Sequence, residues 1–136
     1  MFSNKSTYAL RALAFLAKRY GQEPVLIGDI SRKEKIPKKF LELILLELKL
    51  SGYLDSKKGK HGGYWLIKPP SEIIIGNIIK ILDGPFAQLR CSLSNSNQPC
   101  QGCPGMEQCR VNSLLTNVRD AVSGVLDKYS LSEFAA

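Results

Sequence analysis

The chain has 136 residues, the length of one ordinary domain with short appendages. Its composition is globular, and no stretch reaches the roughly 18 apolar residues that a membrane-spanning helix needs. The net charge of +7 is unevenly placed, because residues 1–90 hold 16 Lys and Arg against 8 Asp and Glu, whereas residues 91–136 hold 3 against 4. We therefore expect a soluble, cytoplasmic protein, with no membrane contact, whose basic N-terminal part faces a polyanion; a merely solvated basic face is the alternative.

Two helices are predicted at the start of the chain. Over residues 6–20 the apolar residues recur with helical spacing, and Gly21 ends the helix. Residues 27–35 predict a shorter second helix with Ile30 facing inward. The expected buried face of the first helix consists of Leu10, Leu13, Ala14, Ala17 and Tyr20.

A third helix is predicted over residues 38–50. Pro37 suits the turn that begins it, and Gly52 stands where a left-handed C-terminal cap is expected. Two helices joined by such a tight turn form a candidate helix-turn-helix. The expected buried stripe of the third helix is Leu41, Ile44, Leu45 and Leu48.

The hydrophobic period changes after Gly52. Residues 53–57 and 64–67 predict two short strands, and the Gly-rich basic tip between them makes a β-hairpin. Two prolines close the second strand, and residues 74–82 predict another helix. The fold class is therefore mainly α with a small β-hairpin (α+β), and residues 1–83 have the element order of a winged helix-turn-helix DNA-binding domain.

The third helix and the hairpin tip carry the candidate DNA contacts. In such domains the start of the third helix contacts base edges and phosphates, and a basic glycine-rich tip can approach the DNA backbone closely. Glu42 could accept a hydrogen bond from a cytosine amino group, or it could be a helix-surface charge near two lysines. The candidate residues are Lys38, Lys39, Phe40 and Glu42 in the helix, and Lys57, Lys58, Gly59, Lys60 and His61 in the hairpin.

Residues 84–109 show no helical or strand period and contain every cysteine of the chain. Without a secretory signal, clustered cysteines favour metal binding or redox chemistry over structural disulfides. Four thiolates could hold an iron–sulfur cluster (2Fe-2S or 4Fe-4S) or zinc, and a thiol–disulfide switch or inert thiols are further alternatives. The candidate metal ligands are Cys91, Cys100, Cys103 and Cys109.

Residues 110–136 predict one long helix of about 22 residues and a tail. Its apolar positions repeat every seven residues, and so small a domain has little surface left to cover them. The same helix of a second chain is therefore the expected partner in a homodimer, and packing back on its own domain is the alternative. The candidate dimer interface is Val111, Leu114, Leu115, Val118, Val122 and Val125.

Three segments together resemble the IscR/NsrR/CymR family of bacterial winged-helix transcription regulators: residues 5–13 (KSTYALRAL), 36–42 (IPKKFLE) and 58–64 (KGKHGGY). The cysteine loop and the long helix after it complete a resemblance that covers nearly the whole chain. It implies a homodimer on a palindrome-like operator, a base-reading role for Glu42 and a basic wing position at Lys58. Family members with three loop cysteines often bind an iron–sulfur cluster.

The cysteine loop departs from the family's usual pattern. Cys103 and Cys109 match two of the usual ligands, whereas Cys91 lies farther upstream and Cys100 is additional. Asn112 stands where the cluster-assembly regulator has a histidine ligand, and the N-terminal segment offers Thr7 where the nitric-oxide sensor has an aspartate. We expect Cys100 to supply the fourth ligand.

The expected function is a transcription regulator whose DNA binding responds to the iron–sulfur cluster, and therefore to redox state, nitric oxide or cluster supply. An enzyme is not expected, because the chain lacks a phosphate-binding loop and any acid–base or nucleophile motif. The alternative is a winged-helix regulator or partner-binding protein with structural zinc or a thiol–disulfide switch.

Overall fold

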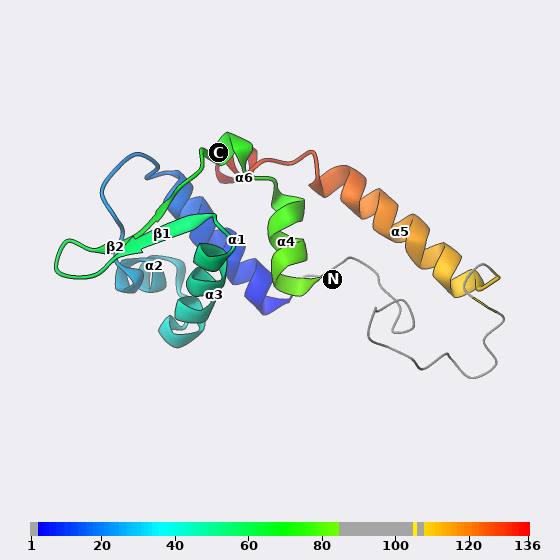
Figure 1. Cartoon of the computed structure of the whole chain (residues 1–136), viewed down its shortest axis with the longest axis horizontal. Helices are drawn as coiled ribbons and strands as arrows, with labels where there is room; N and C mark the ends of the chain where they lie inside the picture. Colours follow the sequence, from blue (N-terminus) through cyan, green and yellow to red (C-terminus); the bar gives the residue numbers. More distant parts are fainter. Residues whose placement is uncertain (1–2, 85–104, 106–107) are drawn as a thin grey trace.

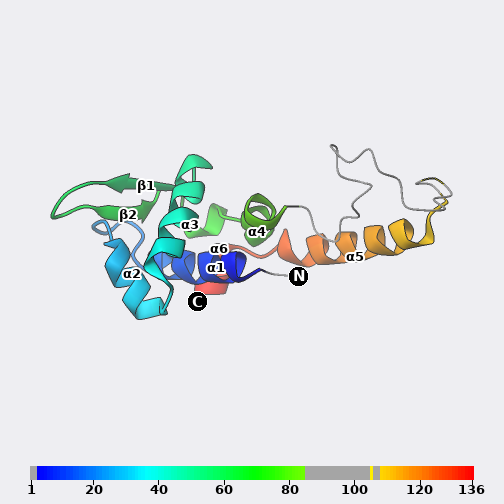
Figure 2. The same ribbon diagram turned by 90° about the horizontal axis from the view of Figure 1, so that it is seen from below.

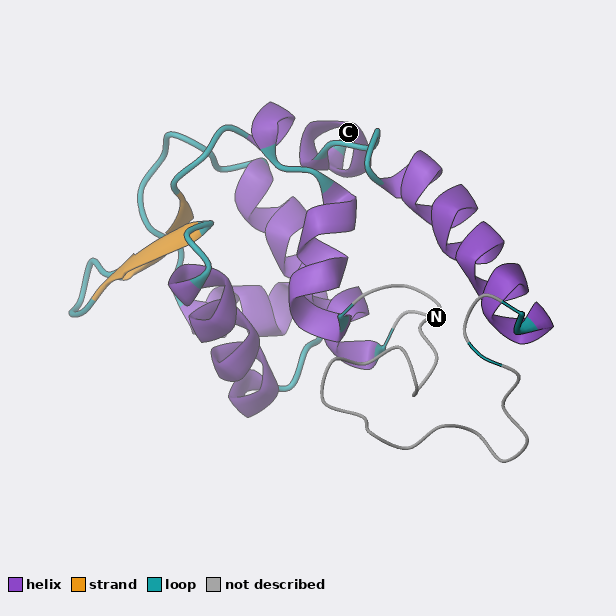
Figure 3. Cartoon of the chain, turned by 45° about the vertical axis from the view of Figure 1, so that its right-hand side comes forward, coloured by secondary structure: helices purple, strands orange, loops and turns teal. Residues whose placement is uncertain are grey.

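The structure is a computed structural model that describes residues 3–84, 105 and 108–136. A body of short helices carries a hairpin at one end, and a long helix extends from the other end (Figure 1; Figure 2). The strands of the described part are confined to this hairpin (Figure 3). The elements are α1 (Asn4–Ala17), α2 (Ile27–Glu34), α3 (Lys38–Leu50), β1 (Leu54–Lys57), β2 (Gly63–Leu66), the 3-10 turn η1 (Pro70–Glu72), α4 (Ile75–Asp83), α5 (Arg110–Leu126) and α6 (Leu131–Ala135).

Helix α1 lies at the centre of the body and packs against α2, α3, α4 and α6. Its N-terminus is capped by Ser3, whose hydroxyl accepts a hydrogen bond from the Ser6 N–H at 3.1 Å. The helix ends at Ala17, three residues earlier than the sequence predicted, so Tyr20 lies beyond it and is 42% exposed. The prediction that Tyr20 belongs to the buried face is wrong, whereas Leu10 and Leu13 are buried as predicted.

Helices α2 and α3 form the helix-turn-helix. Ile30 of α2 is fully buried, and α3 has the predicted bounds. The four predicted inward residues of α3, Leu41, Ile44, Leu45 and Leu48, are all fully buried. Gly52 follows the helix with φ of +88°, which confirms the predicted left-handed residue at its C-terminal end.

The hairpin is antiparallel and pairs Leu54 with Leu66 at its base and Lys57 with Gly63 at its tip. Val25, in the loop between α1 and α2, pairs with Tyr64 of β2 through two backbone hydrogen bonds of 2.8 and 2.9 Å. Gly63 makes this approach possible, since a Cβ there would lie 2.2 Å from the Val25 carbonyl oxygen. Strand β2 is thereby joined, next to the hairpin tip, to the α1–α2 loop, a contact that the sequence did not predict.

The C-terminal part is two helices rather than the one long helix predicted. Helix α5 ends at Leu126, and α6 packs against α1 and η1 with Leu131 fully buried. Backbone hydrogen bonds from Ile75 N–H to the Tyr129 carbonyl (2.9 Å) and from Leu131 N–H to the Ile73 carbonyl (2.8 Å) fix this return. The chain therefore returns to the body along α5 and ends there in α6 (Figure 1).

None of the described helices is long and apolar enough to cross a bilayer.

Candidate nucleic-acid interface

The first turns of α3 present charged side chains to solvent. Lys38, Lys39 and Glu42 are exposed. Within the described residues no ion pair neutralises any of the three, so Glu42 does not pair with the neighbouring lysines. The N-cap position is Pro37, which makes no side-chain capping hydrogen bond, so no N-cap side chain occupies the first-turn N–H groups of α3. This end of α3 has the groups needed to contact phosphates and base edges.

Phe40 was expected to face outward, but it does not. Its ring is half-buried and packs edge-to-face on Tyr8 of α1, with 5.6 Å between ring centroids and 82° between the ring planes. The Arg11 guanidinium lies 5.9 Å from the centroid of the Tyr8 ring and also donates a hydrogen bond to the Glu34 carbonyl. Phe40 therefore holds α3 on α1, and this packing argues against a direct contact of its ring with DNA.

Three further leucines of α3 lie on the solvent side, and the sequence reasoning missed them. Leu43 is 64% exposed and Leu50 is 79% exposed, and Leu46 is also exposed. Their i, i+3, i+7 spacing is itself a helical stripe, offset from the buried one, and this signal was available in the sequence. An apolar side chain on the groove-facing part of such a helix can contact a thymine methyl group.

The hairpin tip is basic and fully accessible. Lys57, Lys58, Gly59, Lys60 and His61 are all exposed, and none of these side chains forms an ion pair within the described residues. The Lys49 ammonium at the end of α3 donates to the Ser56 hydroxyl of β1 at 2.7 Å. This hydrogen bond helps to fix the hairpin against α3, so the two basic elements have a defined relative position.

Helix α5 has no fully buried residue in the described chain. Of the six predicted interface residues, Val111, Leu114 and Val125 are 55–65% exposed, whereas Leu115, Val118 and Val122 are half-buried. Val122 and Leu126 pack on the core of the body. The helix is anchored at this inner end and leaves a broad apolar face uncovered.

Cys109 is the one predicted metal ligand among the described residues, because Cys91, Cys100 and Cys103 lie outside them. It occupies the N-cap of α5, where its sulfur accepts a hydrogen bond from the Asn112 N–H at 3.5 Å. The thiol is free and partly exposed. In the described part of the chain no three His, Cys, Asp or Glu side chains gather as a metal site.

The N-terminus of α1 is tied to the end of α4. Asp83 accepts hydrogen bonds from the Ser3 N–H at 3.1 Å and from the Ser6 hydroxyl at 2.7 Å. Partial burial raises the pKa of Asp83, but these hydrogen bonds and the nearby Lys5 charge outweigh it, so the pKa is lowered overall from 3.8. Thr7, at the position of the nitric-oxide sensor's aspartate, donates its hydroxyl to the Ser3 carbonyl at 3.1 Å. This junction lies next to the point where the chain enters the cysteine segment.

A protein-family comparison matches residues 2–136 to Rrf2, described as an iron-dependent transcriptional regulator. The chain belongs to the Rrf2 family. The fold and the family resemblance predicted from the sequence are thus confirmed, and members of the Rrf2 family are transcription regulators rather than enzymes. DNA binding is accordingly the expected activity of this family member.

Named relatives cover almost the whole chain. An rrf2-like HTH-type transcriptional regulator of Rhodobacter capsulatus is 34% identical over 100% of this chain and 93% of its own length. The HTH-type transcriptional regulator IscR of Photorhabdus laumondii is 31% identical over 96% of this chain and 76% of its own length. The relatives therefore share both the winged helix and the C-terminal part.

Solved structures agree on the fold. CymR of B. subtilis, the global cysteine regulator, has a TM-score of 0.78 at 29% identity, and the match covers 99% of this chain and 95% of the CymR chain. IscR of T. potens has a TM-score of 0.74 at 26% identity, and the match covers 98% of this chain and 85% of the IscR chain. The oxidized form of Staphylococcus aureus CymR has a TM-score of 0.73 at 31% identity, over 99% of this chain and 95% of its own.

Proposed function

We propose that this Rrf2-family protein is a cytoplasmic homodimeric regulator that binds a palindrome-like DNA operator and responds to an iron–sulfur cluster held by its cysteines. The observation that carries the DNA-binding part is the pair of basic elements without ion-pair partners in the described chain, the start of α3 and the hairpin tip, fixed to each other through Lys49 and Ser56. In a winged helix the third helix enters the major groove and the hairpin follows the backbone.

Bases are read by the exposed residues of the first two turns of α3. The Glu42 carboxylate is exposed and has no ion-pair partner in the described chain, so it can accept a hydrogen bond from a cytosine amino group. Leu43 is its exposed neighbour and offers an apolar contact for a thymine methyl group. Lys38 and Lys39 contact phosphates and position the helix, since phosphate contacts fix the register without carrying sequence information.

The dimer is formed by α5 against its counterpart in a second chain. Val111, Leu114 and Val125 would be covered there, and a helix with so wide an uncovered apolar face needs such a partner. Two-fold symmetry then presents two α3 helices to half-sites about 34 Å apart, one turn of DNA. This arrangement explains why the operator should be palindrome-like.

The cluster would be held by Cys91, Cys100, Cys103 and Cys109. Cys109 fits a ligand role because it is a free, partly exposed cysteine at the start of α5. When bound, an iron–sulfur cluster supplies chemistry that is sensitive to redox state and nitric oxide. The four ligands lie in the segment that joins α4 to α5, so ligation there acts on the connection between the DNA-binding body and the dimer helix.

Zinc or a thiol–disulfide switch is the second candidate for the same cysteines. Zinc uses the same tetrahedral thiolate chemistry. The switch is favoured by one comparison, since a solved structure similar to this chain is that of an oxidized CymR. In that case the cysteines change their oxidation state directly, without a resident metal.

Two measurements test the proposal. Protein purified without oxygen should contain iron and sulfide in equal amounts and absorb visible light, and Cys100→Ser should lower the iron content while the exposed Ser113→Ala, a control in α5, leaves it unchanged. Zinc, or no metal after reconstitution, would move the cysteines to the second candidate. Selection of bound sequences from a pool of random DNA duplexes should return a palindrome-like sequence. Equal affinity of the cluster-loaded and cluster-free protein for that sequence would refute control of DNA binding by the cluster.

A further inference from the structure

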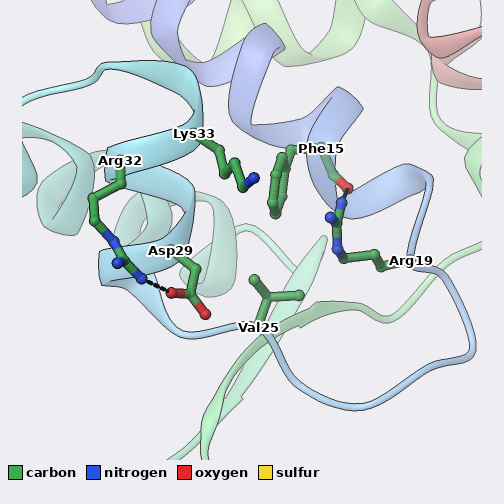
Figure 4. A pocket seen from close by; sticks show the side chains of 6 residues that line it. All are labelled: Phe15, Arg19, Val25, Asp29, Arg32 and Lys33. Carbon is green, nitrogen blue, oxygen red and sulfur yellow. Dashed lines mark hydrogen bonds and ion pairs between the residues drawn. The ribbon is translucent and has the colours of Figure 1, made fainter.

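A hollow lies between α1 and α2 and is not used by the proposed function. Its volume is about 430 Å³, within the range of small-molecule sites in proteins. Phe15 and Val25 provide an apolar surface, and the remaining lining side chains are Arg19, Asp29, Arg32 and Lys33. Figure 4 shows the side chains of α1 and α2 facing each other across it, with Lys33 directed toward Phe15.

The charges of the hollow do not cancel. Arg32 is paired with Asp29 and donates from Nε to the Gly28 carbonyl at 3.3 Å. Lys33 has no ion pair or hydrogen bond among the described residues, and Arg19 has no carboxylate partner there. Two positive charges without an ion-pair partner among the described residues therefore line the hollow, Arg19 just after α1 and Lys33 on α2.

Arg19 is already held in position for a ligand. Its guanidinium carbon lies 3.8 Å from the centroid of the Phe15 ring, and Nη1 donates to the Phe15 carbonyl at 3.2 Å. Such a stacked guanidinium loses little further freedom when it binds a carboxylate, and its planar fork suits that group. The aromatic face next to it can cover an apolar ligand body.

A second hollow, of about 390 Å³, shares Arg19, Val25 and Asp29 with the first and continues along the α1–α2 loop. It adds the acidic Glu23 to the lining. Because a carboxylate is repelled by Glu23 and attracted by Lys33, the charged end of a ligand should lie in the first hollow.

We propose that this hollow binds a small organic anion, a carboxylate carried on an apolar body of aromatic size, as an effector of the regulator. A phosphate backbone would use the cations but has no use for the Phe15 and Val25 surface, so an amphiphilic anion fits the lining better. The site also contacts the proposed DNA-binding elements, because Val25 is hydrogen-bonded to Tyr64 of β2, next to the hairpin tip, and α2 belongs to the helix-turn-helix. Occupancy therefore changes the position of the hairpin relative to α3.

The test uses 2-naphthoate as the probe and 2-naphthamide as its neutral counterpart of the same shape, with amide chemical shifts of the full-length protein as the readout. We expect 2-naphthoate to shift the amides of Phe15, Asp29 and Tyr64. The amide probe, or Lys33→Gln with 2-naphthoate, should bind about tenfold more weakly, the loss expected for one charge-assisted hydrogen bond. Lys18→Gln makes the same charge change at an exposed residue outside the hollow and should bind as the wild type does.

Several results would overturn the proposal. The proposal fails if 2-naphthoate causes no amide shifts at its solubility limit, or if the acid and the amide bind equally well. It also fails if Lys18→Gln and Lys33→Gln lose the same affinity for 2-naphthoate. A second readout is the affinity for the selected duplex, which saturating 2-naphthoate should change by at least about threefold. If Lys33→Gln instead weakens DNA binding without the probe and 2-naphthoate merely competes with DNA, the hollow is a phosphate contact. The probe titration needs no DNA, so its result stands even if the regulator proposal fails.

Discussion

The hairpin tip gives the sharpest quantitative test of DNA binding. Lys58 is exposed and has no ion-pair partner among the described residues, so its whole charge is available to a phosphate. Lys58→Gln removes two positive charges from a dimer. Because each phosphate contact contributes about 0.9 to the slope of log K against log salt, the slope should become less steep by about 1.8. Between 50 and 200 mM salt the wild type should then lose about 12-fold more affinity than the variant.

Fluorescence anisotropy of the selected duplex at several salt concentrations measures this slope. Lys128→Gln is the matched control, because it makes the same charge change at an exposed residue in the short connection between α5 and α6, outside both basic elements. Adding Lys60→Gln to Lys58→Gln should double the effect, to a slope change of about 3.6. If Lys58→Gln and Lys128→Gln both keep the wild-type slope, the hairpin does not contact phosphates and the placement of DNA is refuted.

Three other predictions concern packing, pH and assembly. Leu131→Ala removes a fully buried side chain and should lower the free energy of unfolding, measured by urea titration, by about 2–5 kcal/mol. Leu50→Ala, at an exposed position, should change it by less than about 0.5 kcal/mol, and equal effects of the two variants would mean that α6 is not part of the core. The pKa of Asp83 is lowered on folding, so its ionised form contributes stability above pH 3.8 that is lost as the pH falls through the folded pKa. The free energy of unfolding of Asp83→Asn should therefore depend less on pH than that of the wild type between pH 7 and 3, and an unchanged pH profile would contradict this. Leu114→Glu should shift the dimer to monomer in sedimentation experiments, while the exposed neighbour Ser113→Glu should not, and a stable Leu114→Glu dimer would mean that α5 is not the interface.

The sequence predicted elements well where one periodicity dominated. The buried stripe of α3 could be identified because its leucines and Ile44 recur at helical spacing between Pro37 and Gly52, which mark both ends. For Phe40 the same reasoning failed, because a bulky ring in the first turn reached back to Tyr8, a neighbour that sequence spacing does not show.

At the C-terminal end the heptad spacing was misleading. Tyr129 continued the apolar repeat of α5, yet the helix had already ended at Leu126. Ser130 and Glu133 carry the signal that was overlooked, since the Ser130 hydroxyl accepts from the Glu133 N–H at 3.3 Å in the S-x-x-E pattern of a helix start. The hollow between α1 and α2 was not predictable, because its shape depends on how α2 packs against α1 and because Val25 pairs with Tyr64, a residue distant in sequence.

The joint between Val25 and Tyr64 has a consequence for how such proteins diverge. It is made of main-chain atoms, so the side chains at positions 25 and 64 can change without breaking it, whereas position 63 tolerates no Cβ. Among Rrf2 relatives position 63 should therefore remain glycine while the surrounding residues drift. Natural variation can in this way retune which ligands and which DNA sequences a member prefers, because the attachment of the hairpin itself does not depend on the residues that are being exchanged.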